Sequence, residues 1–330
     1  MVFRASRVAW TLAVIAMAAG MVQASVGDRL PEFRKCVRLC AQANCYDGAP
    51  SLPLYLRLTG WTCERNCDYD CQLVITEERV ARGASVEQFH GKWPFQRVLG
   101  MQEPASVLFS LMNFWPHYRA FGRLGNTLQE GSERTGYYMK AYYLGMTYVG
   151  MNAWFWSSVF HFRDFVVTER LDYFSAAATV LYGFFFACVR TFRLDRPSHA
   201  GARHALAALC LAALTAHVGY LSLVHFSYTY NMAANVAVGV LHNVLWVVHG
   251  VRAYWFDKKS KGAYWALWPI YLVLTISVGM SLELFDFPPI LGAVDAHSLW
   301  HLVTVLPSFY WYRWVELDAA SEGGAKRREE

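Results

Sequence analysis

The chain has 330 residues, of which 55% are hydrophobic, 16% aromatic and only 17% charged. Soluble globular domains carry about a quarter charged residues, so the composition excludes an ordinary soluble enzyme. The formal net charge of +5 does not indicate nucleic-acid binding, because the basic residues beyond the N-terminal region gather in loops between apolar segments. We therefore predict a membrane protein without a nucleic-acid partner.

The first 24 residues have the layout of a secretory signal peptide. Two arginines precede an apolar stretch, and the small-residue pattern that ends at Ala24 predicts cleavage before Ser25. We therefore exclude residues 1–24 from the fold. An uncleaved anchor helix is the alternative.

Six of the eight cysteines are clustered behind this signal peptide. Such a cluster is typical of disulfide bonds formed in an oxidising lumen. The four-residue spacings place sulfur atoms on single helix faces, so we expect two short helices joined by disulfides, with the pairing left open. A structural zinc site is the alternative. Residues 25–103 are thus predicted to form a lumenal cysteine-rich domain, with Cys36, Cys40, Cys45, Cys63, Cys67 and Cys71 as the disulfide candidates.

From Pro104 onward, apolar segments of about twenty residues recur, and each could cross a hydrocarbon core of about 30 Å as a helix. The predicted fold class is an all-α membrane protein with seven transmembrane helices and a small disulfide-rich lumenal N-terminal domain. The helical domain covers residues 104–315, and residues 316–330 form a cytosolic tail. The predicted spans are 104–121, 139–161, 171–189, 204–224, 230–249, 264–282 and 297–315.

The loop charges predict the orientation of these spans. If residues 25–103 are lumenal, seven spans place the C-terminus in the cytosol. The segments expected in the cytosol hold sixteen Lys or Arg residues, whereas the three lumenal loops hold only Arg163 and Arg170. This asymmetry follows the positive-inside rule and supports both the span count and the orientation. The sixteen residues are Arg119, Arg123, Arg134, Lys140, Arg190, Arg193, Arg196, Arg203, Arg252, Lys258, Lys259, Lys261, Arg313, Lys326, Arg327 and Arg328.

Ionisable residues at the lumenal edges of three predicted spans fall at one depth, and such residues indicate function by default. His297 and His301 are four residues apart, which places both imidazoles on one helix face. His161, at the lumenal end of the second span, is the natural third ligand. Three such ligands with an open position are typical of catalytic zinc, so we predict a Zn²⁺ site.

Two further side chains complete the predicted site. Ser157 lies one turn deeper than His161 on the same helix face, and Asp172 is a carboxylate at similar depth that could orient or deprotonate a metal-bound water. Zinc lowers the pKa of such a water to about 7, which suits ester or amide hydrolysis at the membrane surface.

Other interpretations of the histidines remain open at this point. The three could be interfacial polar residues within an aromatic belt formed by Trp300, Trp311 and Trp314. His225, near the lumenal end of its span, is the strongest rival ligand.

The order and spacing of these residues resemble known patterns. Ser157-x-x-x-His161, Asp172 and His297-x-x-x-His301 look like the pattern of the seven-helix hydrolase superfamily that contains the alkaline ceramidases and the adiponectin receptors. The lumenal segment resembles, more particularly, the post-GPI attachment to proteins factor 3 family. The segments that carry this resemblance are Gly27-Asp28, Trp61-Thr62-Cys63 through Cys67-Asp68-Tyr69-Asp70-Cys71, Gln88-Phe89-His90-Gly91-Lys92-Trp93-Pro94-Phe95 and Gln102-Glu103-Pro104-Ala105-Ser106.

The resemblance implies a zinc-dependent GPI-specific phospholipase A2 that removes the unsaturated sn-2 acyl chain of a protein-bound GPI anchor. It implies zinc ligation by the three histidines, activation of water by Asp172 and stabilisation of the oxyanion by Ser157. Its substrates would be GPI-anchored proteins, among membrane lipids, at the lumenal leaflet of the endoplasmic reticulum or, alternatively, of the Golgi. A ceramidase-like amidase and a non-catalytic receptor or cargo adaptor for GPI-anchored proteins are the alternatives.

The role of the cysteine-rich domain is the least determined of these expectations. Trp61, His90, Trp93 and Phe95 offer aromatic faces that could bind the sugars of a GPI glycan. A packed cap on the helices is the favoured alternative.

Overall fold

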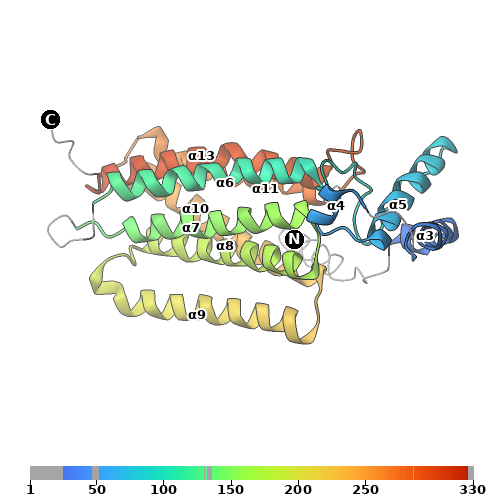
Figure 1. Cartoon of the computed structure of the whole chain (residues 1–330). Helices are drawn as coiled ribbons and strands as arrows, with labels where there is room; N and C mark the ends of the chain where they lie inside the picture. The colour runs from blue at the N-terminus through green and yellow to red at the C-terminus, as the bar shows by residue number, and fades with distance from the viewer. Residues whose placement is uncertain (1–24, 47–51, 130, 132–135, 285, 326–330) are drawn as a thin grey trace, which may run out of the picture.

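The computed structural model describes residues 25–46, 52–129, 131, 136–284 and 286–325, and the predicted signal peptide lies outside them. Over these residues the secondary structure is helical, with isolated β-bridges but no strands. The predicted helical fold class is thereby confirmed. Figure 1 shows a bundle of long helices with α3 and α5 beyond one of its ends.

The cysteine-rich domain is built on two helices, α3 (Pro31–Asn44) and α5 (Cys63–Ala81), flanked by the short α2 (Val26–Arg29) and α4 (Leu54–Leu58). Pro31 starts α3, where its missing N–H costs nothing. The hydroxyl of Thr62 caps α5 by accepting from the Arg65 N–H.

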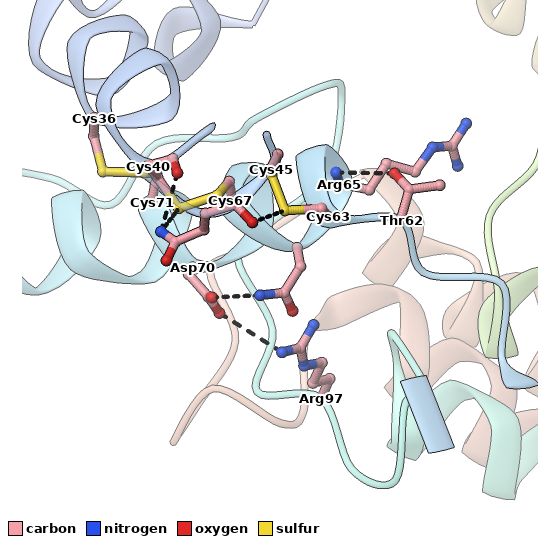
Figure 2. Close-up of a disulfide and its surroundings, with 12 residues drawn as sticks. Cys36, Cys40, Cys45, Thr62, Cys63, Arg65, Cys67, Asp70, Cys71 and Arg97 are labelled. Atoms are coloured by element: carbon pink, nitrogen blue, oxygen red, sulfur yellow. Dashed lines mark hydrogen bonds and ion pairs between the residues drawn. A yellow bond between two sulfur atoms is a disulfide. The ribbon is translucent and has the colours of Figure 1, made fainter. Parts of the chain in front are cut away.

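Three disulfides join α3 to α5, as Figure 2 shows, and the predicted disulfides are confirmed. The Cα atoms of the three pairs lie 5.5–5.8 Å apart. The pairing is nested, so the two helices run antiparallel. The bonds are Cys36–Cys71, Cys40–Cys67 and Cys45–Cys63.

A helix covers each of the seven segments that the sequence analysis singled out as spans. In the bundle, α6 packs against α7 and α13, and α8 packs against α7 and α10. Helix α9 stands at the outer edge of the bundle beside α8 (Figure 1). The elements are α6 (Pro104–Thr127), α7 (Lys140–Phe162), α8 (Val166–Phe192), α9 (Ala200–Gly219), α10 (Tyr228–Trp255), α11 (Trp268–Gly279), α12 (Ser281–Leu284) and α13 (Ala296–Ser321).

Four helical segments within the described residues are long and apolar enough to cross a membrane: Val166–Phe192, Pro197–Val224, Tyr228–Trp255 and Tyr264–Glu283. Helices α6, α7 and α13 are not among them. They carry buried polar side chains such as Asn113, which donates a hydrogen bond to the His301 carbonyl across the α6–α13 contact. The count of seven membrane crossings therefore stays a prediction.

The bundle core contains three tryptophans, Trp246, Trp311 and Trp314, whose ring centroids lie 4.8–5.3 Å apart. Trp311 is 9% exposed and Trp314 is fully buried. These two rings therefore pack inside the protein, and the alternative that placed them in an interfacial belt is wrong for both.

The far end of the bundle is held by buried ion pairs. Arg190 contacts Asp318 at 2.6 Å, and Arg193 contacts Glu322 at 2.6 Å. Lys259 approaches the second oxygen of Glu322 at 2.7 Å. Helix α13 thus continues to Ser321, past the predicted end of the last span, because its final turn closes the bundle at this end.

Candidate metal centre

Two helix ends bring the three predicted ligand histidines together. His161 lies in the last turn of α7, and His297 and His301 occupy the first two turns of α13. The start of α13 is fixed by Asp295, whose side chain caps the Ser298 N–H at 2.8 Å. One ring nitrogen from each histidine falls in a group whose members all lie within 4.8 Å of one another. The predicted convergence of the three imidazoles is therefore present.

The outer ring nitrogen of each histidine is held by a separate side chain. The Nδ1 atoms of His161 and His297 lie 2.7 Å from carboxylate oxygens of Glu103 and Glu283. The Nδ1 atom of His301 lies 3.0 Å from the Ser110 hydroxyl. Metal-binding histidines almost always have such a partner, which fixes the ring and its tautomer.

The facing nitrogens suit a shared cation. The Nε2 atoms of His161 and His297 lie 3.3 Å apart. Neutral imidazoles that donate Nδ1–H to carboxylates present lone pairs to each other at Nε2, and a cation between them relieves that repulsion. Nitrogens bound about 2.0–2.1 Å from one tetrahedral zinc lie about 3.4 Å apart, so the donor set and its spacing fit zinc.

The two other predicted site residues relate to the histidines in different ways. Ser157 is buried, and its hydroxyl lies 3.0 Å from that of Ser110, which joins it to His301. Asp172, near the start of α8, interacts electrostatically with His161 and His297. The roles of both residues stay predictions.

Rival ligands lie apart from this centre. His225 is exposed at the end of the π-helical turn Tyr220–Val224. Among the described residues, the other group with metal-ligand spacing is Cys45, Cys63 and Cys67, whose sulfurs are in disulfides. The structural zinc alternative for the cysteines is therefore wrong.

Sequence reasoning missed three residues of the site: Glu103, Ser110 and Glu283. Glu103 belongs to a segment that carried the family resemblance, but nothing in its spacing linked it to His161. Glu283 lies just beyond the predicted end of its span. A search for carboxylates at the depth of the histidines would have found both.

Lys92, from the cysteine-rich domain, neutralises the carboxylate that holds His161. Its ammonium lies 2.5 Å from Glu103 and 3.1 Å from Asp164. Burial alone would lower the pKa of Lys92, but these two carboxylates raise it above its ordinary value. Burial opposes ionisation of Glu103 as well, yet Lys92 and His161 hold the pKa of Glu103 below its usual range.

A pocket opens between the cysteine-rich domain and the bundle, beside the metal centre. Its walls combine aromatic rings with amide, carboxylate and amine groups. Glu103 faces both this pocket and His161. The lining residues used below are Tyr69, His90, Lys92, Trp93, Gln102 and Glu103.

Only part of the predicted aromatic surface is available to a ligand. Trp61 and Phe95 are each 6% exposed, and the Trp61 ring packs against the Arg163 guanidinium at 4.1 Å. The suggestion that Trp61 offers a face to sugars is therefore wrong. His90, Trp93 and Phe95 do line the pocket.

The sequence matches the model of the Per1-like family over residues 53–319. A protein named Protein PER1 homolog from Schizosaccharomyces pombe is 42% identical over 299 residues, 89% of this chain and 87% of the relative. Proteins named GPI-specific phospholipase A2-like PGAP3 are 39% identical in Bos taurus and 37% in Homo sapiens, each over 93% of both chains. No solved structure matches the chain. The chain belongs to the Per1-like family.

Proposed function

We propose that this protein hydrolyses the sn-2 acyl ester of protein-bound GPI at a metal centre formed by His161, His297 and His301. The observation that carries the proposal is the convergence of these imidazoles, each with its Nδ1 atom held by a separate side chain. The substrate class is inferred from relatives that bear the name GPI-specific phospholipase A2-like.

Zinc, when bound, supplies a Lewis acid that makes water nucleophilic at neutral pH. Asp172 would take the proton of the attacking water and pass it to the lipid alkoxide that leaves as the sn-2 ester C–O bond breaks, which releases a fatty acid and the lyso-lipid. Ser157 donates a hydrogen bond to the ester oxygen as negative charge develops on it. Glu103 and Glu283 keep the imidazoles of His161 and His297 in the tautomer that leaves Nε2 free.

The expected position in the membrane agrees with this substrate. In the predicted orientation the metal centre lies at the lumenal leaflet, in the endoplasmic reticulum or alternatively the Golgi, where GPI-anchored proteins reside among membrane lipids. The polar headgroup would enter the pocket beside Trp93 and Gln102, whose aromatic and amide groups suit a hydroxyl-rich ligand. The acyl chains would then lie along the apolar helices.

The proposal predicts that removing one ligand histidine abolishes GPI lipid remodelling. In cells that depend on this protein, His297→Ala or His301→Ala at normal protein level should leave the unsaturated sn-2 chain on GPI-anchored proteins. Loss of a ligand should cost more than the about 10²- to 10³-fold typical of one oxyanion donor. Mass spectrometry of the released GPI lipid measures the outcome.

The matched control is His225→Ala, which changes a histidine outside the centre. Cells with this variant should remove the unsaturated sn-2 chain normally. Normal removal of the unsaturated chain in both ligand variants would contradict the proposed hydrolysis.

Assay of the purified protein on ceramide and on a GPI lipid separates the ester hydrolase from an amidase. A purified protein that binds no metal, by elemental analysis, would favour the non-catalytic alternative.

A further inference from the structure

We propose that Lys92 is a positioning residue of the metal centre, so that the cysteine-rich domain is a part of the site and not only its cap. This inference rests on the proposed metal centre. It is independent of which lipid is hydrolysed.

A continuous line of polar contacts runs from the domain to a ligand. The Lys92 ammonium donates to one oxygen of Glu103 at 2.5 Å, and the other oxygen lies 2.7 Å from Nδ1 of His161. Glu103 is 5% exposed. A buried carboxylate without a counter-charge is strongly disfavoured, so the Lys92 ammonium pairs with Glu103 and holds it in place.

Lys92 is itself fixed from two sides. Its ammonium also contacts Asp164 at 3.1 Å and lies 4.0 Å above the ring of Phe160, one residue before His161. Its backbone pairs with Phe89 through hydrogen bonds of 2.8 and 2.9 Å. The tight turn between them places Gly91 at φ +80°, a conformation that favours glycine.

The same segment of the domain also contacts the chain beyond α12. The indole N–H of Trp93 donates to Asp286 at 2.7 Å, and the side-chain amide of Gln88 donates to the other oxygen of Asp286 at 2.8 Å. Asp286 follows Glu283 in the chain, and Glu283 holds Nδ1 of His297. Residues 88–93 therefore contact Glu103 through Lys92, and Asp286 through Gln88 and Trp93.

A purely structural ion pair would behave differently from a positioning residue. If Lys92 only joined the domain to the bundle, its loss would lower the melting temperature and leave the zinc affinity of the folded protein unchanged. If Lys92 positions Glu103, zinc affinity falls, because changes to such supporting groups typically cost about 10- to 100-fold in metal affinity.

The test measures the zinc dissociation constant of the purified full-length protein by competition with a chelator, alongside the melting temperature of the metal-free protein. We expect Lys92→Met to weaken zinc binding about 10- to 100-fold and Lys92→Arg, which keeps the charge, to recover most of that loss. The matched control is Arg82→Met, which removes an exposed ion pair with Glu78 in the same domain and should change nothing.

Wild-type zinc affinity in folded Lys92→Met overturns the inference. If Lys92→Met does not fold, Glu103→Gln decides instead, since the inferred positioning acts through this carboxylate; unchanged zinc affinity there overturns the inference. His161→Ala separates the two proposals. If the wild type binds zinc, His161→Ala loses it and the Lys92 and Glu103 variants keep it, only the positioning role fails. If the wild type binds no zinc, both fail.

Discussion

Individual residues at the candidate metal centre hold the three imidazoles in two different ways. Carboxylates hold His161 and His297, whereas a neutral hydroxyl, that of Ser110, holds His301. Ser110 also bonds Ser157. Ser157 is thus separated from a ligand by a single side chain, and its role in stabilising the oxyanion has to be distinguished from a role in supporting His301.

Replacing each serine in turn makes that distinction. Ser157→Ala should reduce kcat by about 10²- to 10³-fold with little change in zinc content, because it removes a donor to developing charge. Ser110→Ala should instead weaken zinc binding, because it leaves Nδ1 of His301 with only the more distant Ser106 carbonyl, at 3.5 Å. Hydrolysis of a GPI lipid and zinc content of the purified variants are measured side by side.

Ser158→Ala is the control for the Ser157 variant. The Ser158 hydroxyl donates to the Trp154 carbonyl of its own helix at 2.7 Å. Its loss should therefore leave GPI lipid hydrolysis and zinc content near the wild-type values. Equal loss of zinc in the Ser157 and Ser110 variants would show that Ser157 supports His301 and would rule out the oxyanion role.

The convergence of the three histidines could be predicted from sequence, and depth could have pointed to Glu103 and Glu283, but the contacts that Glu103, Ser110 and Glu283 make with the histidines could not be predicted. The spacing of His297 and His301 is a local property of one helix, and their common depth with His161 follows from span boundaries. Glu103 reaches His161 because α6 packs against α7, and Ser110 and Glu283 reach the histidines of α13 because α6 and α12 pack against α13. No periodic pattern in the sequence encodes those contacts.

At the scale of elements, α3 and α5 were predictable as helices and their disulfide pairing was not. Cysteine spacing defines which sulfurs share a helix face, but parallel and antiparallel helices with the same spacing allow different bonds. Packing of Phe33 and Ile75 in the core of the domain favours the antiparallel arrangement observed. Each disulfide in such a small domain contributes about 2–4 kcal/mol of stability.

His90 joins two elements of this domain in a way that should depend on pH. Its Nδ1 and Nε2 atoms lie 3.2 Å from Asp28, in α2, and 3.0 Å from Asp68, in α5. The hydrogen bond with Asp68 raises the pKa of His90, partly offset by burial. A raised pKa in the folded state means that the imidazolium stabilises the fold below about pH 6.5 and that this contribution is lost as pH rises through the raised value.

We therefore expect His90→Asn to lower the melting temperature of the purified protein at about pH 6 and to match the wild type more closely at about pH 9. Asparagine suits the test because it tolerates the left-handed backbone of His90, with φ of 50°. His204→Asn, at an exposed position of α9, should show no pH-dependent difference. A difference in melting temperature between the wild type and His90→Asn that grows as the pH rises would contradict the ion-pair role.

At the scale of the whole molecule, the bundle has two chemically different ends. The metal centre and the cysteine-rich domain lie at one end. The ion pairs Arg190–Asp318 and Arg193–Glu322 close the other end. The sequence located all seven helical segments. It could not establish that all seven cross a membrane, because α6, α7 and α13 bury polar side chains against one another and so fall short in hydropathy.

Glycosylation reports which end is lumenal. Gly83→Asn creates an Asn-Ala-Ser acceptor at an exposed turn with φ of 73° and open space around it, so the fold should tolerate it. We expect this variant to gain a glycan, detected as an endoglycosidase-sensitive shift on a gel. An acceptor tag added after Glu330 should stay unmodified, and glycans at both sites would indicate an even number of crossings.

The position of Glu103 between the pocket and His161 has a pharmacological consequence. A small molecule seated against this carboxylate would disturb the metal centre without touching the metal. Inhibitors of this kind need no chelating group, and so avoid the indiscriminate binding to zinc enzymes that chelators bring. Their selectivity would come from side chains of the cysteine-rich domain that line the pocket, among them Tyr69, His90 and Trp93.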